Sequence, residues 1–386
     1  MPKARARKDG RYVLTVSLGK GADGNYKRKD FYGKSPKECE AEYKKFIINT
    51  EKGIQTDISK MTYGEWLDTW LNDYMKDSIR ATTWASYETQ VRKHIKPALG
   101  DVKLQKVQAD HVQKLLREKQ QDGARVDGQK GKLSSRSVRY IYTVIHASLE
   151  HAVKTRKLAY NPCDGVKLPA KSNGNENKKL KVLTAEDLKK LLDITNQTRH
   201  NTLIQLALQT GLRRGELLGL KWTDINYSTK TLTVNRNLVR IPKEGLGFQK
   251  PKNGKTRIVG LTDSMIKELE NHGTQQLWEK KQAEKSYQDD GLIFCTEEGK
   301  PIDPRAFNRY YEQMLKKAEL PHMGIHSLRH TFTELAYNSG VDIKTISEIL
   351  GHHSTAFTMD IYQHLNQEML DDSAKKIDKM FQGIAN

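Results

Sequence analysis

The C-terminal half of the sequence concentrates residue types that together could do chemistry on a phosphate ester. His326 and Arg329 are spaced to share one helical face, and His352 and Tyr362 follow them. Further upstream, Arg213 comes directly after a glycine-marked turn that ends an apolar segment. Guanidinium groups fit phosphate oxygens, and neighbouring positive charge favours the phenolate that a tyrosine needs in order to attack phosphorus. Because fixed guanidinium groups also stabilise the charge of the transition state, this set predicts phosphoryl transfer without a metal.

Two other interpretations of the same residues stay open at this point. His326 and His330 have the i,i+4 spacing of a helical zinc pair, but Ser327 stands where a metalloprotease has its glutamate. Arg329 would also place a fixed positive charge beside the cation. Taken singly, each residue could instead be structural, with histidines that cap helix ends, a half-buried tyrosine, and an arginine that pairs with Glu216.

The whole chain is strongly basic. Its 386 residues hold 66 Lys+Arg and 47 Asp+Glu, which is a formal net charge of +19. Residues 1–50 hold 13 Lys/Arg and 6 Asp/Glu, so 13 − 6 = +7 falls in this first segment. Phosphate contacts release condensed counterions, so this charge favours a polyanionic partner, although membrane surfaces and ribosomes would also fit.

No apolar run is long enough to span a bilayer, and the N-terminus lacks the pattern of a secretory signal. We therefore expect a cytoplasmic protein that has no membrane anchor. Cys39, Cys163 and Cys295 lie far apart, which fits neither a disulfide framework nor a paired-cysteine metal site. These cysteines are expected to be reduced and structural, with no metal or cofactor.

Residues 1–55 are predicted to form a small β-sheet with one helix. Two short segments rich in β-branched and aromatic residues lie between Arg11 and Tyr32, and a glycine-rich turn separates them, as in a hairpin. Ser35 is the expected N-cap of the next helix, with Pro36 at its first position and Glu38 completing a capping box. The module is interpreted as a DNA-binding unit, and a solvated basic hairpin is the alternative.

Residues 60–169 are predicted to be helical. Two apolar stripes at helical spacing are expected to form the core, namely Trp84, Tyr87, Val91, Ile95 and Val138, Ile141, Val144, Ile145, Leu149, Val153. The opposite faces carry basic residues that could lie along phosphates or simply be solvated, namely Arg80, Arg92, Lys93, Arg136 and Arg139.

Residues 170–179 are polar and contain glycine and asparagine, so they are predicted to be an exposed linker. A longer domain, residues 180–386, follows. We expect helices at 185–195, which Thr184 would cap, and at 201–220, then strand-like alternation, then helices from 262 onward. The predicted fold class is multidomain α+β, with an N-terminal sheet-plus-helix module, an all-α domain, and a mainly α catalytic domain that contains a small antiparallel sheet.

The segments TGLRRGE, HSLRHTF, LGHHS and DIY occur in this order and resemble the tyrosine recombinase (phage integrase) family along the whole chain. The chain looks most like integrases of temperate phages and conjugative transposons of Gram-positive bacteria. The resemblance implies an arm-site DNA-binding domain at 1–55, a core-site DNA-binding domain at 60–169, and a catalytic domain at 180–386.

The resemblance also assigns roles to individual residues. The matching catalytic residues are Arg213, Lys252, His326, Arg329, His352 and the nucleophile Tyr362. Arg214 and His353 occupy variable positions of the family's motifs, and these two residues and His330 are interpreted as lying outside the catalytic set. The family carries its lysine in a β-hairpin turn, where Lys250, Lys252 and Lys255 are all candidates here, and Lys252 has the most similar position.

By this resemblance, Tyr362 attacks the scissile phosphate, a 3′-phosphotyrosyl bond forms, and Lys252 protonates the leaving 5′-hydroxyl. A 5′-hydroxyl of the partner duplex then attacks, so neither ATP nor metal is needed. The implied assembly is a homotetramer on double-stranded DNA that carries core and arm sites, in the nucleoid of a bacterial cell. An excisionase or a host DNA-bending protein could assist, and the segment Asn366–Phe381 could dock on a neighbouring subunit.

Two alternatives are kept. A type IB topoisomerase-like enzyme would share the nicking chemistry but reseal the same strand. A DNA-binding regulator would lack catalysis altogether.

Overall fold

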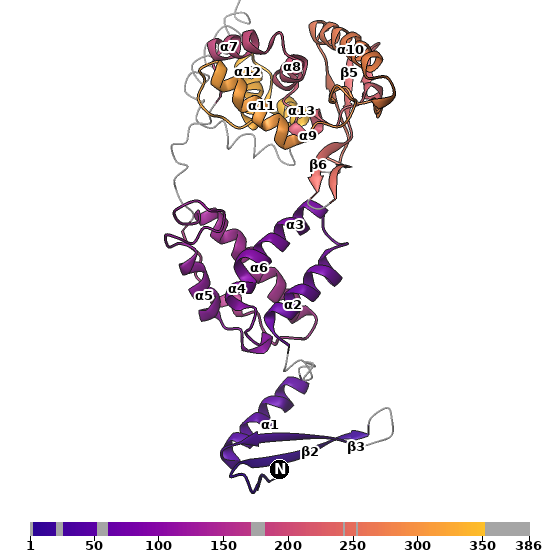
Figure 1. Ribbon diagram of the computed structural model, residues 1–386. Helices are drawn as coiled ribbons and strands as arrows, with labels where there is room; N and C mark the ends of the chain where they lie inside the picture. The colour runs from indigo at the N-terminus through magenta and orange to yellow at the C-terminus, as the bar shows by residue number, and fades with distance from the viewer. Residues whose placement is uncertain are drawn as a thin grey trace, which may run out of the picture. The chain divides into compact units, whose positions relative to one another are not determined.

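The computed structural model describes residues 3–20, 26–51, 61–170, 182–241, 244–251 and 254–351 (Figure 1). The chain divides into two compact units, residues 1–175 and 176–386. This boundary falls inside the predicted linker at 170–179, while the finer division into three domains stays a prediction. In the described part of the chain, no helix has both the length and the apolar character needed to cross a membrane.

The N-terminal module is an antiparallel sheet with the strand order β1-β2-β3, followed by one helix. The elements are β1 (Arg5–Ala6), β2 (Tyr12–Lys20), β3 (Tyr26–Gly33) and α1 (Pro36–Glu51). The predicted hairpin and helix are confirmed. The strand β1 was not predicted, because two residues are too few to show alternation.

The sheet packs on α1 through the buried side chains of Leu14, Phe31 and Cys39. Ser35 caps the helix as predicted, since its hydroxyl accepts a hydrogen bond from the Glu38 N–H at 3.3 Å. The Glu38 carboxylate reaches back one residue further than expected and accepts from the Lys34 N–H at 2.7 Å, so the predicted capping box is wrong in this detail.

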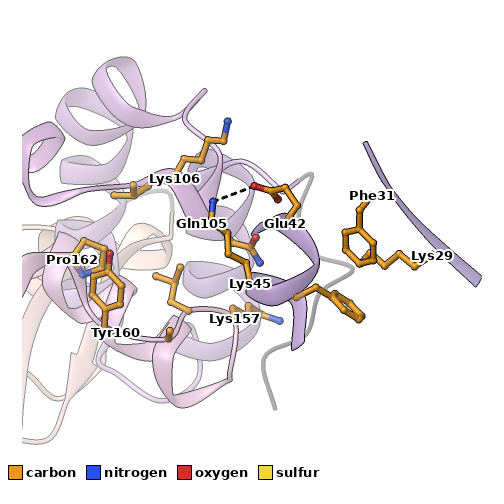
Figure 2. Close-up of a pocket in the computed structure, with 13 residues that line it drawn as sticks. Lys29, Phe31, Glu42, Lys45, Gln105, Lys106, Lys157, Tyr160 and Pro162 are labelled. Atoms are coloured by element: carbon orange, nitrogen blue, oxygen red, sulfur yellow. Dashed lines mark hydrogen bonds and ion pairs between the residues drawn. The ribbon is translucent and has the colours of Figure 1, made fainter. Parts of the chain in front are cut away.

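Basic side chains surround this small core. Figure 2 shows Lys29 and Phe31 on β3, and Glu42 and Lys45 on α1. The Lys29 ammonium lies 4.4 Å from the centroid of the Phe46 ring, and Lys45 pairs with Glu42 at 3.1 Å. The aliphatic parts of these lysines can therefore cover apolar surface while their charged ends face water.

The next part of the chain is helical, as predicted. Its elements are α2 (Tyr63–Thr69), the π-helix η2 (Trp70–Met75), α3 (Ala81–Gln90), the π-helix η3 (Val91–Ile95), α4 (Lys96–Leu99), the 3₁₀ helix η4 (Leu104–Lys106), α5 (Ala109–Glu118), α6 (Ser135–Lys154) and the 3₁₀ helix η5 (Pro162–Gly165). Both predicted apolar stripes belong to one hydrophobic cluster, with Trp84, Tyr87 and Val153 only partly buried at its margin. The hydroxyl groups of Tyr63 and Ser148 lie 2.7 Å apart and tie α2 to α6.

The basic residues of this helical part differ in their surroundings. Arg139 donates twice to the carbonyl of Pro169, at 2.7 and 3.1 Å, and so holds the chain just before the predicted linker. Arg92 pairs with Glu88 at 2.8 Å on the surface of the helix. Lys93 and Arg136 are exposed. Phosphate contact by this face therefore stays a prediction, and Arg139 has a structural partner.

The C-terminal unit is mainly helical, with two small antiparallel sheets of strand order β4-β5-β8 and β6-β7. Its elements are α7 (Ala185–Thr195), α8 (Asn201–Thr210), α9 (Arg214–Leu217), the 3₁₀ helix η6 (Trp222–Asp224), β4 (Ile225–Asn226), β5 (Thr231–Val234), β6 (Asn237–Ile241), β7 (Gly245–Gln249), β8 (Arg257–Gly260), α10 (Asp263–Ala283), the 3₁₀ helix η7 (Glu284–Ser286), α11 (Pro304–Lys317), α12 (His326–Asn338) and α13 (Ile343–Leu350). The predicted Thr184 cap is present, since its hydroxyl accepts from the Asp187 N–H at 3.2 Å.

The predicted helix at 201–220 is wrong in its length. It ends at Thr210, because Gly211 adopts a left-handed φ of +60°, and a short helix begins again at Arg214. A Cβ at Gly211 would lie 2.4 Å from Cδ1 of Phe332, so only glycine fits where α8 meets α12. This break is what brings Arg213 to the start of a helix.

Two further details of this unit differ from the sequence prediction. The strand β7 was not predicted, because its sequence GLGFQ contains two glycines and weak alternation. The helical region expected from 262 onward is interrupted between η7 and α11 by extended chain, where Leu292 bridges to Lys221 and Cys295 bridges to Pro301. The fold class itself is confirmed.

Candidate active site

Three of the six predicted site residues lie within the described residues, namely Arg213, His326 and Arg329. The other three, Lys252, His352 and Tyr362, lie outside the described residues, as do His353 and the segment Asn366–Phe381.

Arg213 stands at the start of the short helix α9 and is held by Glu216. Its Nη1 donates to Glu216 Oε1 at 3.0 Å, and its backbone N–H donates to Oε2 at 3.0 Å. The carboxylate is 1% exposed, whereas the Arg213 side chain is 26% exposed. The salt bridge proposed as a structural alternative does exist, but it also orients a guanidinium group that water, and hence a phosphate, can reach.

Arg329 lies deeper, between the ends of two helices. It is 3% exposed, and its Nη1 and Nη2 donate to the carbonyls of Gly211 and Leu350, each at 2.9 Å. These carbonyls follow α8 and end α13, where unpaired carbonyls and the helix dipole attract a cation. The guanidinium group therefore joins the segment that leads to Arg213 with the segment that leads to His352.

His326 begins α12 and is exposed, and its ring contacts His330 edge to face with a centroid distance of 4.8 Å. Partial removal of the imidazole ring from water, together with the charges of His330, Arg329 and Arg213, lowers the pKa of His326 to about 4. At pH 7 the imidazole is neutral and can accept a proton.

The influence of Arg213 and Arg329 on His326 places the three described residues in one electrostatic neighbourhood. The pKa of His330 is also lowered, first by burial and then by the charge of Arg329. The local field is positive, because the guanidinium groups of Arg213 and Arg257 share the one carboxylate of Glu216, and Arg329 adds a further charge near His326. Such a field favours an anionic ligand.

Arg257 is a residue that the sequence reasoning missed. It begins β8 and forms a two-pronged pair with Glu216, with Nη1 to Oε1 at 3.1 Å and Nη2 to Oε2 at 2.7 Å. Burial alone would raise the pKa of Glu216, but hydrogen bonds and charge from Arg257 and Arg213 outweigh it and lower the pKa. A charged residue opening the otherwise apolar strand RIVG was the only signal in the sequence.

Arg214, the neighbour of Arg213, points to a different part of the unit. Its Nη1 donates to Asn308 Oδ1 on α11 at 2.6 Å. Burial lowers its pKa, and the charge of Asp303 opposes that shift. These contacts agree with the assignment of Arg214 as a residue outside the site.

The three candidate lysines lie in the connection between β7 and β8. Lys250 and Lys255 are exposed, and Lys252 lies outside the described residues. The family's hairpin turn is not reproduced in the described strands, because β7 pairs with β6 while β8 pairs with β5. The lysine segment therefore connects two sheets.

A zinc site would need more than the His326 and His330 pair. Among the residues that the structure describes, no three His, Cys, Asp or Glu side chains lie close enough together to hold a metal ion. Arg329 is also close enough to His330 to lower its pKa, and that positive charge disfavours a cation at the pair.

Two family models match parts of this chain. Residues 181–369 match the model of the phage integrase family, and residues 62–120 match the model of the phage integrase N-terminal SAM-like domain. The chain is 30% identical over 386 residues to a tyrosine recombinase XerC-like protein of Caldanaerobacter subterraneus subsp. tengcongensis, with 96% of each chain covered.

Solved structures show the same fold. The Tn1549 transposon integrase in complex with transposon right end DNA has a TM-score of 0.65 at 19% identity, covering 82% of this chain and 100% of that chain. A lambda integrase tetramer bound to a Holliday junction has a TM-score of 0.53 at 18% identity, covering 92% of this chain and 96% of that one. With a relative at 30% identity along nearly its whole length, the chain belongs to the phage integrase family of tyrosine recombinases.

Proposed function

We propose that this chain cuts and rejoins double-stranded DNA at specific sites through a 3′-phosphotyrosyl bond to Tyr362. Membership of the family makes it a DNA strand-transferring, site-specific recombinase of the integrase type, and neither the topoisomerase-like nor the regulatory alternative is favoured. The observation that supports the detailed chemistry is that Arg329, in the first turn of α12 with His326, binds the Gly211 carbonyl just before Arg213 and the Leu350 carbonyl at the end of α13.

In this proposal Arg213 binds a nonbridging oxygen of the scissile phosphate directly, since its guanidinium group is oriented by Glu216 and partly exposed. Arg329 supplies positive charge from within the protein. It reaches the phosphate when its hydrogen bond to either the Gly211 or the Leu350 carbonyl breaks. Both groups stabilise the charge that builds up on the pentacoordinate phosphorus.

Proton transfer is assigned to the histidines and to Lys252. As the Tyr362 oxygen bonds to phosphorus, its proton passes to His326 or His352, and the lowered pKa of His326 provides a neutral acceptor. The bond from phosphorus to the 5′-oxygen breaks, and that oxygen takes a proton from Lys252. Rejoining reverses these steps with a 5′-hydroxyl of the partner duplex.

Independence from metal and ATP is part of the same proposal. The phosphotyrosyl bond keeps the energy of the broken phosphodiester, so rejoining needs no further energy source. Arg213 and Arg329 supply the positive charge that a divalent cation provides in many phosphoryl transfer sites.

The partners are proposed by likeness to the family. The Tn1549 and lambda integrases were solved on DNA, and one lambda structure is a tetramer on a Holliday junction, which supports double-stranded DNA and a homotetramer here. We assign arm-site binding to residues 1–55 and core-site binding to residues 60–169. An excisionase or host DNA-bending protein as helper, and a place in the bacterial nucleoid, belong to the same proposal.

The open face of the N-terminal sheet supports the arm-site assignment. Thr15 donates to Asp30 at 2.6 Å, Tyr32 donates to the same carboxylate at 3.2 Å, and the Arg7 guanidinium lies 5.4 Å from the centroid of the Tyr32 ring. These exposed polar and aromatic groups lie opposite the face that packs on α1, where they can meet phosphates and base edges.

A recombination assay tests the proposal as a whole. The full chain is incubated with two differently marked DNA fragments that carry the ends of its own element and the matching chromosomal site, in EDTA and without ATP. Exchanged products are expected. Two results would contradict the proposal. One is relaxation of a supercoiled plasmid that carries the same sites, without any exchange of strands, and the other is exchange only after Mg²⁺ is added.

The role of Lys252 is tested with a sulfur leaving group. Lys252→Ala should slow cleavage of an ordinary substrate by about 100-fold or more, the size typical of a general acid. Cleavage should recover on a substrate whose 5′-bridging oxygen is replaced by sulfur, because a thiolate leaves without being protonated. Lys250→Ala and Lys255→Ala are the matched controls, and rescue of either of these in place of Lys252→Ala would reassign the acid.

A further inference from the structure

Arg257 is largely buried, and each of the three nitrogens of its guanidinium group donates a hydrogen bond within the protein. Its Nη1 and Nη2 bind the two oxygens of Glu216, and its Nε donates to the carbonyl of Ile349 at 2.7 Å. The side chain is 11% exposed. These contacts leave it poorly placed to bind DNA itself, in contrast to Arg213.

Arg257 contacts two separate segments, the helix start at Glu216 and the last turn of α13. Glu216 holds Arg213 through Nη1 and through the backbone N–H. Ile349 lies in the last turn of α13, and the chain continues through Gly351 directly to His352. One guanidinium group therefore connects the helix start that orients Arg213 with the helix end that leads to His352.

The junction at the end of α13 is tight. Gly351 has a φ of +66°, and a Cβ there would lie 3.1 Å from Cδ and 3.2 Å from Nη1 of Arg257. Next to it, Arg329 binds the Leu350 carbonyl and the Gly211 carbonyl. Arg257 and Arg329 thus form two parallel connections between the segment around Arg213 and the end of α13.

We propose that Arg257 is a positioning residue for strand cleavage, which fixes Arg213 relative to the segment that carries His352 without contacting the phosphate. The proposal rests on the function proposed above. Lysine cannot replace it, because one ammonium lacks the planar fork that binds a carboxylate at two points while a third N–H binds a carbonyl.

The test measures single-turnover cleavage of a nicked DNA substrate by the full chain, at saturating DNA, and separates the rate constant from the amplitude. For Arg257→Lys we expect the rate constant to fall by about 100-fold, since a displacement of about 1 Å at a reacting group has an effect of this size. The amplitude and the DNA affinity should remain close to those of the unmodified chain.

The matched control is Arg199→Lys, which changes another arginine with little exposure in the same unit. Arg199 pairs with Glu279 at 2.5 Å and also donates to the carbonyl of Cys295, away from the residues of the candidate site. Arg199→Lys should lower the thermal stability of the protein and at most the amplitude of cleavage. The rate constant of cleavage should stay unchanged. Gly351→Ala, which crowds Arg257 from its other side, should lower the rate constant as Arg257→Lys does.

Several outcomes would overturn the inference. An unchanged rate constant with a reduced amplitude in Arg257→Lys would show that the residue only stabilises the fold. Equal losses of the cleavage rate constant in Arg257→Lys and Arg199→Lys would show that Arg257 has no special role in cleavage. Failure of the unmodified chain to form a covalent adduct would instead count against the proposed function, so the two failures are distinguishable.

Discussion

Tyr362→Phe should abolish covalent attachment of the chain to DNA. A nicked duplex is the substrate, because the cleaved fragment diffuses away and the protein–DNA bond persists. Without the hydroxyl no phosphotyrosyl bond can form, so the slowly migrating protein–DNA adduct on a denaturing gel should disappear. No other substitution is expected to reduce the amount of adduct as much. Binding of the same duplex in a native gel should be retained, since phosphate contacts over the whole surface dominate affinity.

The control for Tyr362→Phe is Tyr310→Phe, which removes another tyrosine hydroxyl in the same unit. The Tyr310 hydroxyl lies 2.6 Å from that of Thr198, so the change removes one hydrogen bond without touching the candidate site. This variant should still form the adduct. An adduct that persists in Tyr362→Phe would show that another residue is the nucleophile.

Arg213→Ala should lower the rate constant of cleavage by about 1,000-fold, in the range seen when one preorganised donor to a developing negative charge is removed. The fold should survive, because Glu216 keeps both hydrogen bonds from Arg257, at 3.1 and 2.7 Å, and so is not left as an unpaired buried charge. The measurement is single-turnover cleavage at saturating DNA, together with a thermal melt of the free protein.

Arg214→Ala is the matched control for Arg213→Ala, because the two arginines are adjacent but have different partners. Arg214 donates to the partly buried Asn308 on α11, and its loss should reduce stability by about 1 kcal/mol, the size typical of one intramolecular hydrogen bond. The rate constant of the folded fraction should not change. A larger loss of rate in Arg214→Ala than in Arg213→Ala would reverse the assignment of the two residues.

Tyr362 and Arg213 belong to different parts of the proposed site. Arg213 is described by the structure, and its partner Glu216 explains how a partly exposed guanidinium group can have a defined direction. Tyr362 lies outside the described residues, and its role comes from the motif that it occupies. If both variants behave as expected, Tyr362 is the nucleophile and Arg213 is a residue that binds the scissile phosphate.

Much of the local structure was accessible from the sequence because its causes are local. The caps at Ser35 and Thr184, the hairpin between Arg11 and Tyr32, and the apolar stripe of α6 each depend on residues close together in the chain. The ordered motifs around Arg213, His326 and Tyr362 likewise indicated the family that the comparisons then showed.

Other features depended on contacts between distant segments. The predicted helix at 201–220 breaks at Gly211 because Phe332 of another helix occupies the space of a side chain there. The depth of Arg329 was not foreseen, since its acceptors are the Gly211 and Leu350 carbonyls at the ends of two helices. The hydrophobic periodicity of the sequence does not indicate which helix ends lie next to each other.

What the sequence by itself determined was the set of reactive residue types, their order, and the family and class of fold to which they belong. Only the tertiary structure showed that Glu216 binds both Arg213 and Arg257, and that Arg257 continues to the end of α13. The physical reason is that a buried charge must find a partner, but which partner it finds depends on the packing of segments far apart in the chain.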